Sequence, residues 1–97
     1  MKDIVMSNIE IEDWVICEEK YDLRNLKLRI FLENNIGKII SYKNDSKSYG
    51  VKYFNIPDDI ISNFNYNCRG MYNSEIVYFS KNREDLQIMI EASKYNL

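Results

Sequence analysis

Residues 36–54 read IGKIISYKNDSKSYGVKYF and carry the clearest strand pattern of the chain. Residues 36–43 are a short apolar run typical of a β-strand, and residues 49–54 are its partner, with Val51 among aromatic rings. Residues 44–48, NDSKS, separate the two runs and are the polar residues expected in a turn. The stretch therefore predicts two antiparallel strands joined by a short connection.

Residues 9–17 predict a first strand with an irregularity in it. Ile9 and Ile11 alternate with acidic residues, whereas Trp14 and Ile16 continue on the other parity. A turn or bulge between the two parts accounts for this change of parity.

Residues 22–35 carry two patterns that conflict. Asp22 is a suitable N-cap, apolar residues at 23, 26 and 30 recur as on one face of a helix, and Asn34-Asn35 is a suitable end. Apolar residues also alternate at 26, 28, 30 and 32, as in a strand. The helix-forming residues of the segment lead us to expect a helix. Whether it packs on the sheet or extends as an arm toward a partner is left open.

The second half of the chain predicts a short helical turn, a loop and two more strands. Pro57 opens the turn near residues 57–63, residues 65–74 form a polar loop, and residues 75–79 form a strand. Apolar residues alternate at 86, 88 and 90, so we expect a closing strand there. A helix over residues 82–94, capped by Asn82 and with an apolar stripe at 86, 89 and 90, is the alternative.

Length and composition predict one domain over residues 1–97. A chain of 97 residues that is 45% hydrophobic can bury enough apolar surface to fold without disulfides or metals. Its apolar runs are too short to cross a membrane, and residues 1–7 lack the apolar core of a secretory signal, so we expect a cytoplasmic protein. The excess of Asn, Ile, Lys and Tyr, whose codons are rich in A and T, indicates a low-GC genome.

No group of residues predicts catalysis, a metal site or a cofactor. Histidine, the usual general base and the commonest metal ligand, is absent. We expect Cys17 and Cys68 to be reduced and structural, although Cys68 beside Arg69 is the best candidate nucleophile. The acidic pairs are expected on the solvated surface, at Glu12-Asp13, Glu18-Glu19, Asp58-Asp59 and Glu84-Asp85.

The order of these features resembles a class of small phage and prophage proteins that look like β-barrels of the Src-homology-3 (SH3) type. Short motifs carry the resemblance over residues 36–90: IGKII at 36–40, YGVKY at 49–53, CRG at 68–70, IVYF at 76–79 and Asp85-Leu86. The resemblance implies a mainly-β or α+β fold, a small five-stranded SH3-like barrel with residues 14–17 on its first strand. The inserted segment at 22–35 and the missing histidine near the cysteine depart from that class.

We expect a non-enzymatic protein that binds another protein. Its thirteen aromatic residues are more than so small a core readily buries, and residues 65–74 gather types enriched at interfaces, namely Tyr66, Arg69, Met71 and Tyr72. The first nineteen residues hold six acids and one lysine, a charge of −5, which suits an oriented partner or a homo-oligomer. By analogy with small phage inhibitors, the expected partner is a host protein such as a defence nuclease or effector, which would make the protein anti-CRISPR-like.

Two alternatives use the basic hairpin instead. It carries Lys38, Lys43, Lys47 and Lys52 against Asp45 alone, a charge of +3, and these lysines with Tyr49 suit nucleic acid. The same lysines with Arg69 would suit a protein that binds and sequesters a signalling nucleotide, a so-called sponge. The net charge of −2 for the whole chain counts against a general nucleic-acid binder.

Overall fold

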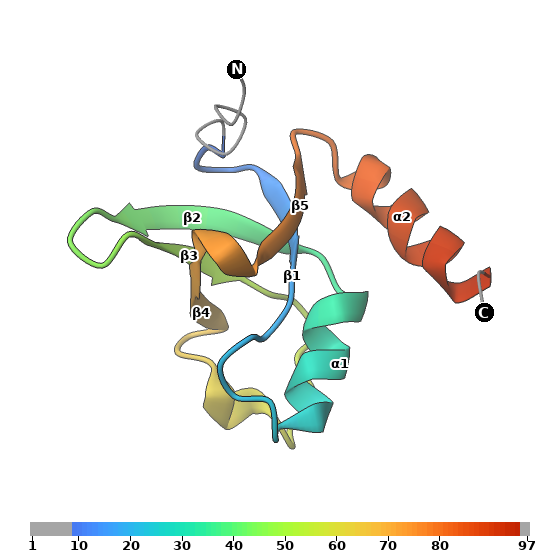
Figure 1. Ribbon diagram of the computed structural model, residues 1–97, viewed down its shortest axis with the longest axis horizontal. Helices are drawn as coiled ribbons and strands as arrows, with labels where there is room; N and C mark the ends of the chain where they lie inside the picture. The colour runs from blue at the N-terminus through green and yellow to red at the C-terminus, as the bar shows by residue number, and fades with distance from the viewer. Residues whose placement is uncertain (1–8, 96–97) are drawn as a thin grey trace.

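The computed structural model describes residues 9–95, which form an α+β fold built on a five-stranded antiparallel sheet (Figure 1). The strands lie in the order β4-β3-β2-β1-β5, with bounds β1 Trp14–Cys17, β2 Gly37–Lys43, β3 Ser48–Lys52, β4 Cys68–Tyr72 and β5 Ile76–Ser80. The helices are α1 Leu26–Asn34 and α2 Arg83–Tyr95, with single 3₁₀ turns at η2 Ile61–Asn63 and η3 Asn73–Glu75. Residues 1–7, for which no secretory signal is predicted and which include the charged Lys2 and Asp3, lie outside the described residues.

The predicted hairpin is confirmed as β2 and β3. Tyr42 lies opposite Tyr49 at its end, with ring centroids 4.8 Å apart, and residues 44–47 form the turn between the strands. The register shifts between Ile39 and Ser41, which places a bulge in β2. This bulge determines which lysines share a face of the sheet.

The first strand is shorter than the pattern predicts. Ile9 is buried and Ile11 is exposed. The prediction that these two residues lie on the same face of one strand is therefore wrong. Glu12 has a φ of 80°, and its backbone N–H still bonds to the Ile39 carbonyl at 2.7 Å. The predicted turn therefore lies at residues 11–12, and regular pairing starts at Trp14.

The helix predicted in residues 22–35 is confirmed, but it turns a different face to the core. Asn25, not Asp22, caps it by accepting a hydrogen bond from the Leu28 backbone at 3.2 Å. The buried residues are Leu28, Phe31 and Leu32, and they join the central core, so α1 packs on the sheet and is not a free arm. The apolar stripe at 23, 26 and 30 is exposed to solvent.

The loop predicted at residues 65–74 is wrong, because Cys68–Tyr72 is strand β4, paired with β3. Tyr66 and Asn67 both have positive φ, 54° and 66°, and Asn65 exchanges two backbone hydrogen bonds with Cys68, at 2.8 and 3.0 Å. This is the geometry of a two-residue hairpin turn, in which a left-handed pair matches the twist of the strands. Tyrosine is not a usual residue at such a turn, so the sequence pattern misses it.

The strand expected at residues 86–91 is also wrong, because α2 occupies this region. Leu86 and Ile90, four residues apart, are buried together, whereas Ile88 is exposed. The Ser80 hydroxyl accepts a hydrogen bond from Asn82 at 3.1 Å and donates one to Asp85 at 2.8 Å, which orders the start of the helix. The helical alternative with a stripe at 86, 89 and 90 matches the structure better, although Met89 is partly exposed.

The core lies between the sheet and α1, and a smaller cluster lies under α2. Three aromatic rings, those of Phe31, Tyr53 and Phe64, pack edge to face with centroids 5.7–6.0 Å apart. The turn predicted near residues 57–63 is present as η2. The closed barrel implied by the resemblance is not confirmed, because within residues 9–95 the sheet is open, with β4 and β5 as its edges.

Gly37 is required by close packing, which gives a test of the core. A Cβ at this position would overlap Val51 Cγ1 and meet the Tyr53 ring at 3.0 Å. We predict that Gly37→Ala lowers the free energy of unfolding by about 1–3 kcal/mol, because the packed core cannot yield. Urea unfolding followed by circular dichroism measures this change.

Gly70→Ala is the matched control, since no atom lies within 4 Å of a Cβ built at Gly70. This variant is expected to be as stable as the natural chain or slightly more stable. Equal losses in both variants would contradict the packing of β2 described above.

Candidate binding site

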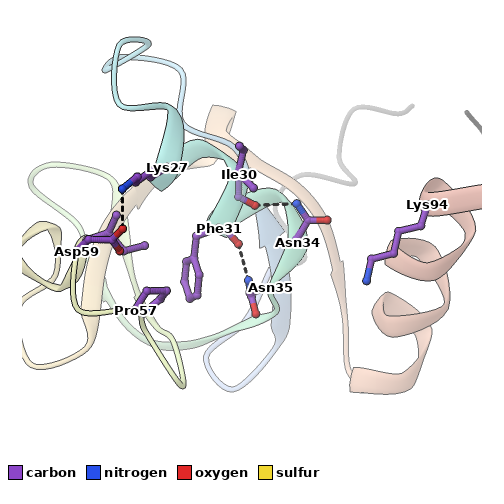
Figure 2. Close-up of a pocket in the computed structure, with 9 residues that line it drawn as sticks. Lys27, Ile30, Phe31, Asn34, Asn35, Pro57, Asp59 and Lys94 are labelled. Carbon is purple, nitrogen blue, oxygen red and sulfur yellow. Dashed lines mark hydrogen bonds and ion pairs between the residues drawn. The ribbon is translucent and has the colours of Figure 1, made fainter.

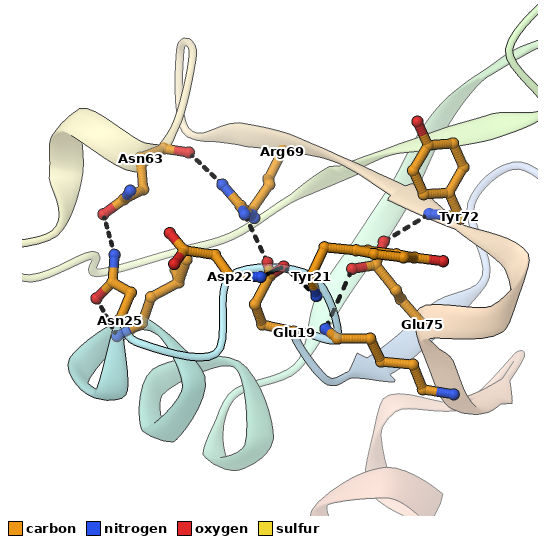
Figure 3. A network of polar contacts seen from close by, with 10 residues as sticks. Glu19, Tyr21, Asp22, Asn25, Asn63, Arg69, Tyr72 and Glu75 are labelled. Carbon is orange, nitrogen blue, oxygen red and sulfur yellow. Dashed lines mark hydrogen bonds and ion pairs between the residues drawn. The ribbon is translucent and has the colours of Figure 1, made fainter.

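A hollow of about 580 Å³ lies beside the edge strand β4 (Figure 3). Its residues come from the loop after β1, from β4 and from η3: Glu19, Tyr21, Arg69, Gly70, Tyr72 and Glu75. Two aromatic rings, two buried carboxylates and a guanidinium therefore meet in one place.

Tyr21 and Tyr72 stand at the opening of this hollow, which we call the tyrosine pocket. Their ring centroids are 5.8 Å apart and their planes are 81° apart, so one ring turns its edge to the other (Figure 3). Their exposed fractions are 68% and 48%. The Tyr21 hydroxyl lies 3.4 Å from Ser74 Oγ and is otherwise turned to solvent. The pocket thus presents aromatic surface that the fold does not bury.

Glu19, which is buried, forms an ion pair with the half-buried Arg69, with Nη2 to Oε1 at 2.6 Å. The other Glu19 oxygen accepts backbone hydrogen bonds from Tyr21 at 2.9 Å and Asp22 at 2.8 Å, and Arg69 also donates to the Asn63 carbonyl at 3.0 Å. Burial alone would raise the pKa of Glu19, but the hydrogen bonds from Arg69 and the two backbone groups hold this pKa below its usual value of 4.5. The pair fastens the loop after β1 to β4.

Glu75 is a second buried carboxylate, and no ion pair formed among residues 9–95 includes it. It accepts hydrogen bonds from the backbone of Tyr72 at 2.9 Å and of Lys20 at 3.5 Å. Since the charges of Glu19 and Arg69 cancel, Glu75 leaves the tyrosine pocket with one surplus negative charge.

The prediction that the acidic pairs are solvated is wrong for two of their members. Asp13 is buried, accepts a hydrogen bond from the Glu10 backbone at 2.9 Å and pairs with Lys81 at 2.7 Å. Glu19 is buried against Arg69. Two acids that are adjacent in the sequence point to opposite faces of an extended chain, so one of each pair can point inward. Asp13 and Glu19 point inward, and both accept hydrogen bonds there.

The structure brings together only part of the predicted protein-binding set. Arg69 and Tyr72 line the tyrosine pocket, whereas Met71 is fully buried and is not a surface residue, because β4 turns it into the core. Tyr66 is highly exposed at the hairpin turn and does not line the pocket. Tyr21 and the two buried glutamates are missing from the prediction. Tyr21 lies 51 positions from Tyr72, and no local signal links such distant residues.

No lysine of the basic hairpin lines the tyrosine pocket, although Lys43 lies in one row of the sheet with Ser48 and Tyr72. Lys43, Lys47 and Lys52 are exposed, and Lys38 is half-buried. Tyr49 does not join them, because it packs in part against the core beside Met71.

A further hollow, of about 510 Å³, lies between α1 and residues 57–60 (Figure 2). Its apolar wall includes Ile30 and Phe31, with Lys94 of α2 opposite. Most of its polar groups already have partners: Lys27 pairs with Asp59 at 2.9 Å, and Asn34 and Asn35 donate to helix carbonyls. It offers fewer free groups for recognition than the tyrosine pocket.

Both cysteines are free thiols, as expected. Burial raises the pKa of Cys17 to about 12, although the adjacent Tyr53 hydroxyl lowers it in part. Cys68 is partly exposed on β4. Within residues 9–95, no group of three or more Cys, Asp or Glu side chains is arranged to hold a metal ion. No helix of this part of the chain is long and apolar enough to cross a membrane.

The ion pair of the tyrosine pocket gives a pH-dependent prediction. Glu19→Gln removes the charge that Arg69 faces, so we expect the unfolding free energy at neutral pH to fall by roughly 2–4 kcal/mol. Because the folded-state pKa of Glu19 is lowered, its contribution is present above pH 4.5 and is lost as pH falls through the folded pKa. The stabilities of the two proteins should therefore converge in acid.

Urea unfolding at neutral and acidic pH measures both effects. Lys27→Met, which breaks the exposed pair with Asp59, is the control and should change stability little. A loss in Glu19→Gln that stays constant with pH would contradict the assignment.

The thiols give an independent test of burial. Since the thiolate is the reactive form, we predict that iodoacetamide modifies Cys68 and spares Cys17 in the folded protein. In urea both cysteines should react. Mass spectrometry of the digested protein assigns the modified site, and equal labelling in the folded state would show that the core around Cys17 is open.

No family model matches the chain, and neither a curated protein nor a solved structure matches it. The tyrosine pocket is therefore interpreted from its own geometry, and the resemblance to SH3-like phage proteins stays a prediction.

Proposed function

We propose that the protein is a non-catalytic binding module that docks on another protein by taking a Lys or Arg side chain of that partner into the tyrosine pocket. The observation that carries the proposal is the exposed right-angled pair of Tyr21 and Tyr72 above Glu75, a buried carboxylate outside the ion pairs of residues 9–95.

The charge of the pocket selects a cation. A cation near the face of a tyrosine ring is attracted by the ring, and the gain increases when water is excluded. Glu75 adds the attraction of a carboxylate, which is costly to leave buried without a counter-charge. An entering ammonium or guanidinium group would offset both charges, whereas an acidic side chain would be repelled.

The residue types also fit a protein interface. Tyrosine is enriched among the residues that dominate binding energy, because a rigid ring gains large contact area for little lost conformational freedom. Arg69 keeps its position through Glu19 and Asn63, so the pocket is formed before the partner arrives.

We further propose that the open sheet is a relative of SH3-like barrels. Each strand from β1 to β4 pairs with the next along the chain, and β5 returns to pair with β1. The single turn η3 lies between β4 and β5, and α2 follows β5 in place of a closing strand. A phage origin, a cytoplasmic location, and a host defence nuclease or effector as the partner rest on the resemblance and on composition, and they stay predictions.

A peptide array tests the recognition of a cation. We expect the protein to retain peptides with a central Lys or Arg and to lose those in which this residue is Gln or Glu. Tyr21→Ala or Tyr72→Ala should weaken binding about three- to tenfold, which corresponds to the loss of one ring from around a cation. Glu75→Gln, which keeps the acceptor for the Tyr72 backbone, should also weaken it.

Tyr78→Ala is the matched control, because Tyr78 is 44% exposed, close to the 48% of Tyr72, but lies on β5. Its binding should equal that of the natural chain. Equal retention of Lys and Glu peptides, or equal effects of the Tyr72 and Tyr78 variants, would overturn the proposal.

A further inference from the structure

The three neighbouring strands β2, β3 and β4 contain basic residues and no acidic ones. Their charged residues are Lys38, Lys43, Lys52 and Arg69, and Arg69 is occupied by Glu19. The acidic residue of the hairpin, Asp45, lies in its turn. This part of the sheet is therefore positive although the whole chain carries −2.

The bulge in β2 places three lysines on one face of the sheet. Lys38 and Lys43 are five positions apart, which in a regular strand would put them on opposite faces. The register shift between Ile39 and Ser41 changes this: Lys38 lies opposite Lys52, and Lys43 lies opposite Ser48. Since positions 48 and 52 share a face, the three lysines lie on the face away from the core, over roughly 13 Å of strand.

Small side chains form the floor between the lysines. Gly50 lies opposite both Ser41 and Gly70 in the central part of this face, and a Cβ at Gly50 would overlap the Ser41 hydroxyl. Because these side chains are small, they leave a hollow of about 230 Å³, which Lys43 also lines. A ligand can therefore approach the backbone closely.

Aromatic rings accompany two of the lysines. The Lys38 ammonium lies 5.2 Å from the centre of the Trp14 ring, and the Lys52 ammonium lies 5.8 Å from that of Phe54. Phe54 is exposed and Trp14 is half-buried. A cation beside an exposed ring is the combination by which proteins hold a phosphate and stack an unpaired base.

The lysines of the hairpin are free of ion pairs within residues 9–95. The ion pairs among the described residues employ Lys20, Lys27, Arg69 and Lys81. Lys38 and Lys52 face each other directly, and like charges in that position repel. A bound polyanion would relieve this repulsion.

We propose that this lysine face binds a single-stranded nucleic acid. The phosphates contact Lys38, Lys43 and Lys52, with Lys47 at the end of the hairpin, and a base stacks on Phe54. This function is separate from cation recognition in the tyrosine pocket and uses the outer face of β2 and β3.

Fluorescence anisotropy with a labelled oligothymidine of roughly ten nucleotides tests the proposal. Three phosphate contacts predict that the logarithm of the association constant falls with the logarithm of salt concentration with a slope of about −2, and Lys43→Glu should reduce this slope by about 0.7 or more. Phe54→Ala should weaken binding about fivefold or more through the lost stacking. A duplex should bind more weakly than the single strand.

Lys94→Glu is the control, because it makes the same charge change on an exposed residue of α2. It should leave the affinity almost unchanged, and circular dichroism confirms that each variant is folded. The proposal would be overturned by binding that does not depend on salt or by equal effects of Lys43→Glu and Lys94→Glu. It would also be overturned if a mononucleotide bound as tightly as the single strand. Tyr21→Ala should not change oligonucleotide binding, so failure of the tyrosine pocket is distinguished from failure of the lysine face.

Discussion

The ion pair between the buried Glu19 and the half-buried Arg69 is the interaction on which the candidate site depends. It joins two segments 50 positions apart, and the same carboxylate holds the backbone of Tyr21 and Asp22. Because a buried carboxylate needs its donors, the loop after β1 has little freedom to move away from β4. The position of the Tyr21 ring against Tyr72 follows from this constraint.

Two regions of opposite charge meet near β4, where Tyr72 of the tyrosine pocket lies opposite Ser48, which in turn lies opposite Lys43. Arg69 points to the inner side and is neutralised there beside Glu75, whereas the outer faces of the neighbouring strands carry lysines without acids. A cationic partner segment is attracted by the tyrosine pocket and repelled by the lysine face. A polyanion is attracted by the lysine face and repelled by the tyrosine pocket.

Sequence patterns predicted the hairpin, where the local signals agree, and they gave mixed results where a helical and a strand pattern compete. The hairpin was predicted correctly, and the helix α1 was predicted to exist but with the wrong N-cap and the wrong buried face. The segment of α2 alternates as in a strand, yet only Leu86 and Ile90 find apolar partners, so the helical spacing prevails. β4 was missed because its turn uses Tyr66 and Asn67 in left-handed conformations, which no common turn motif marks.

The sequence by itself determined the β2–β3 hairpin, the excess of lysine within it and the lack of histidine, because these are local or compositional properties. Only the tertiary structure decided which residues meet. Glu19 finds Arg69, and Tyr21 finds Tyr72, through the register of strands far apart in the chain. The bulge in β2 likewise places Lys38 and Lys43 on one face. Register and burial depend on the packing of the whole sheet, and no short stretch of residues encodes them.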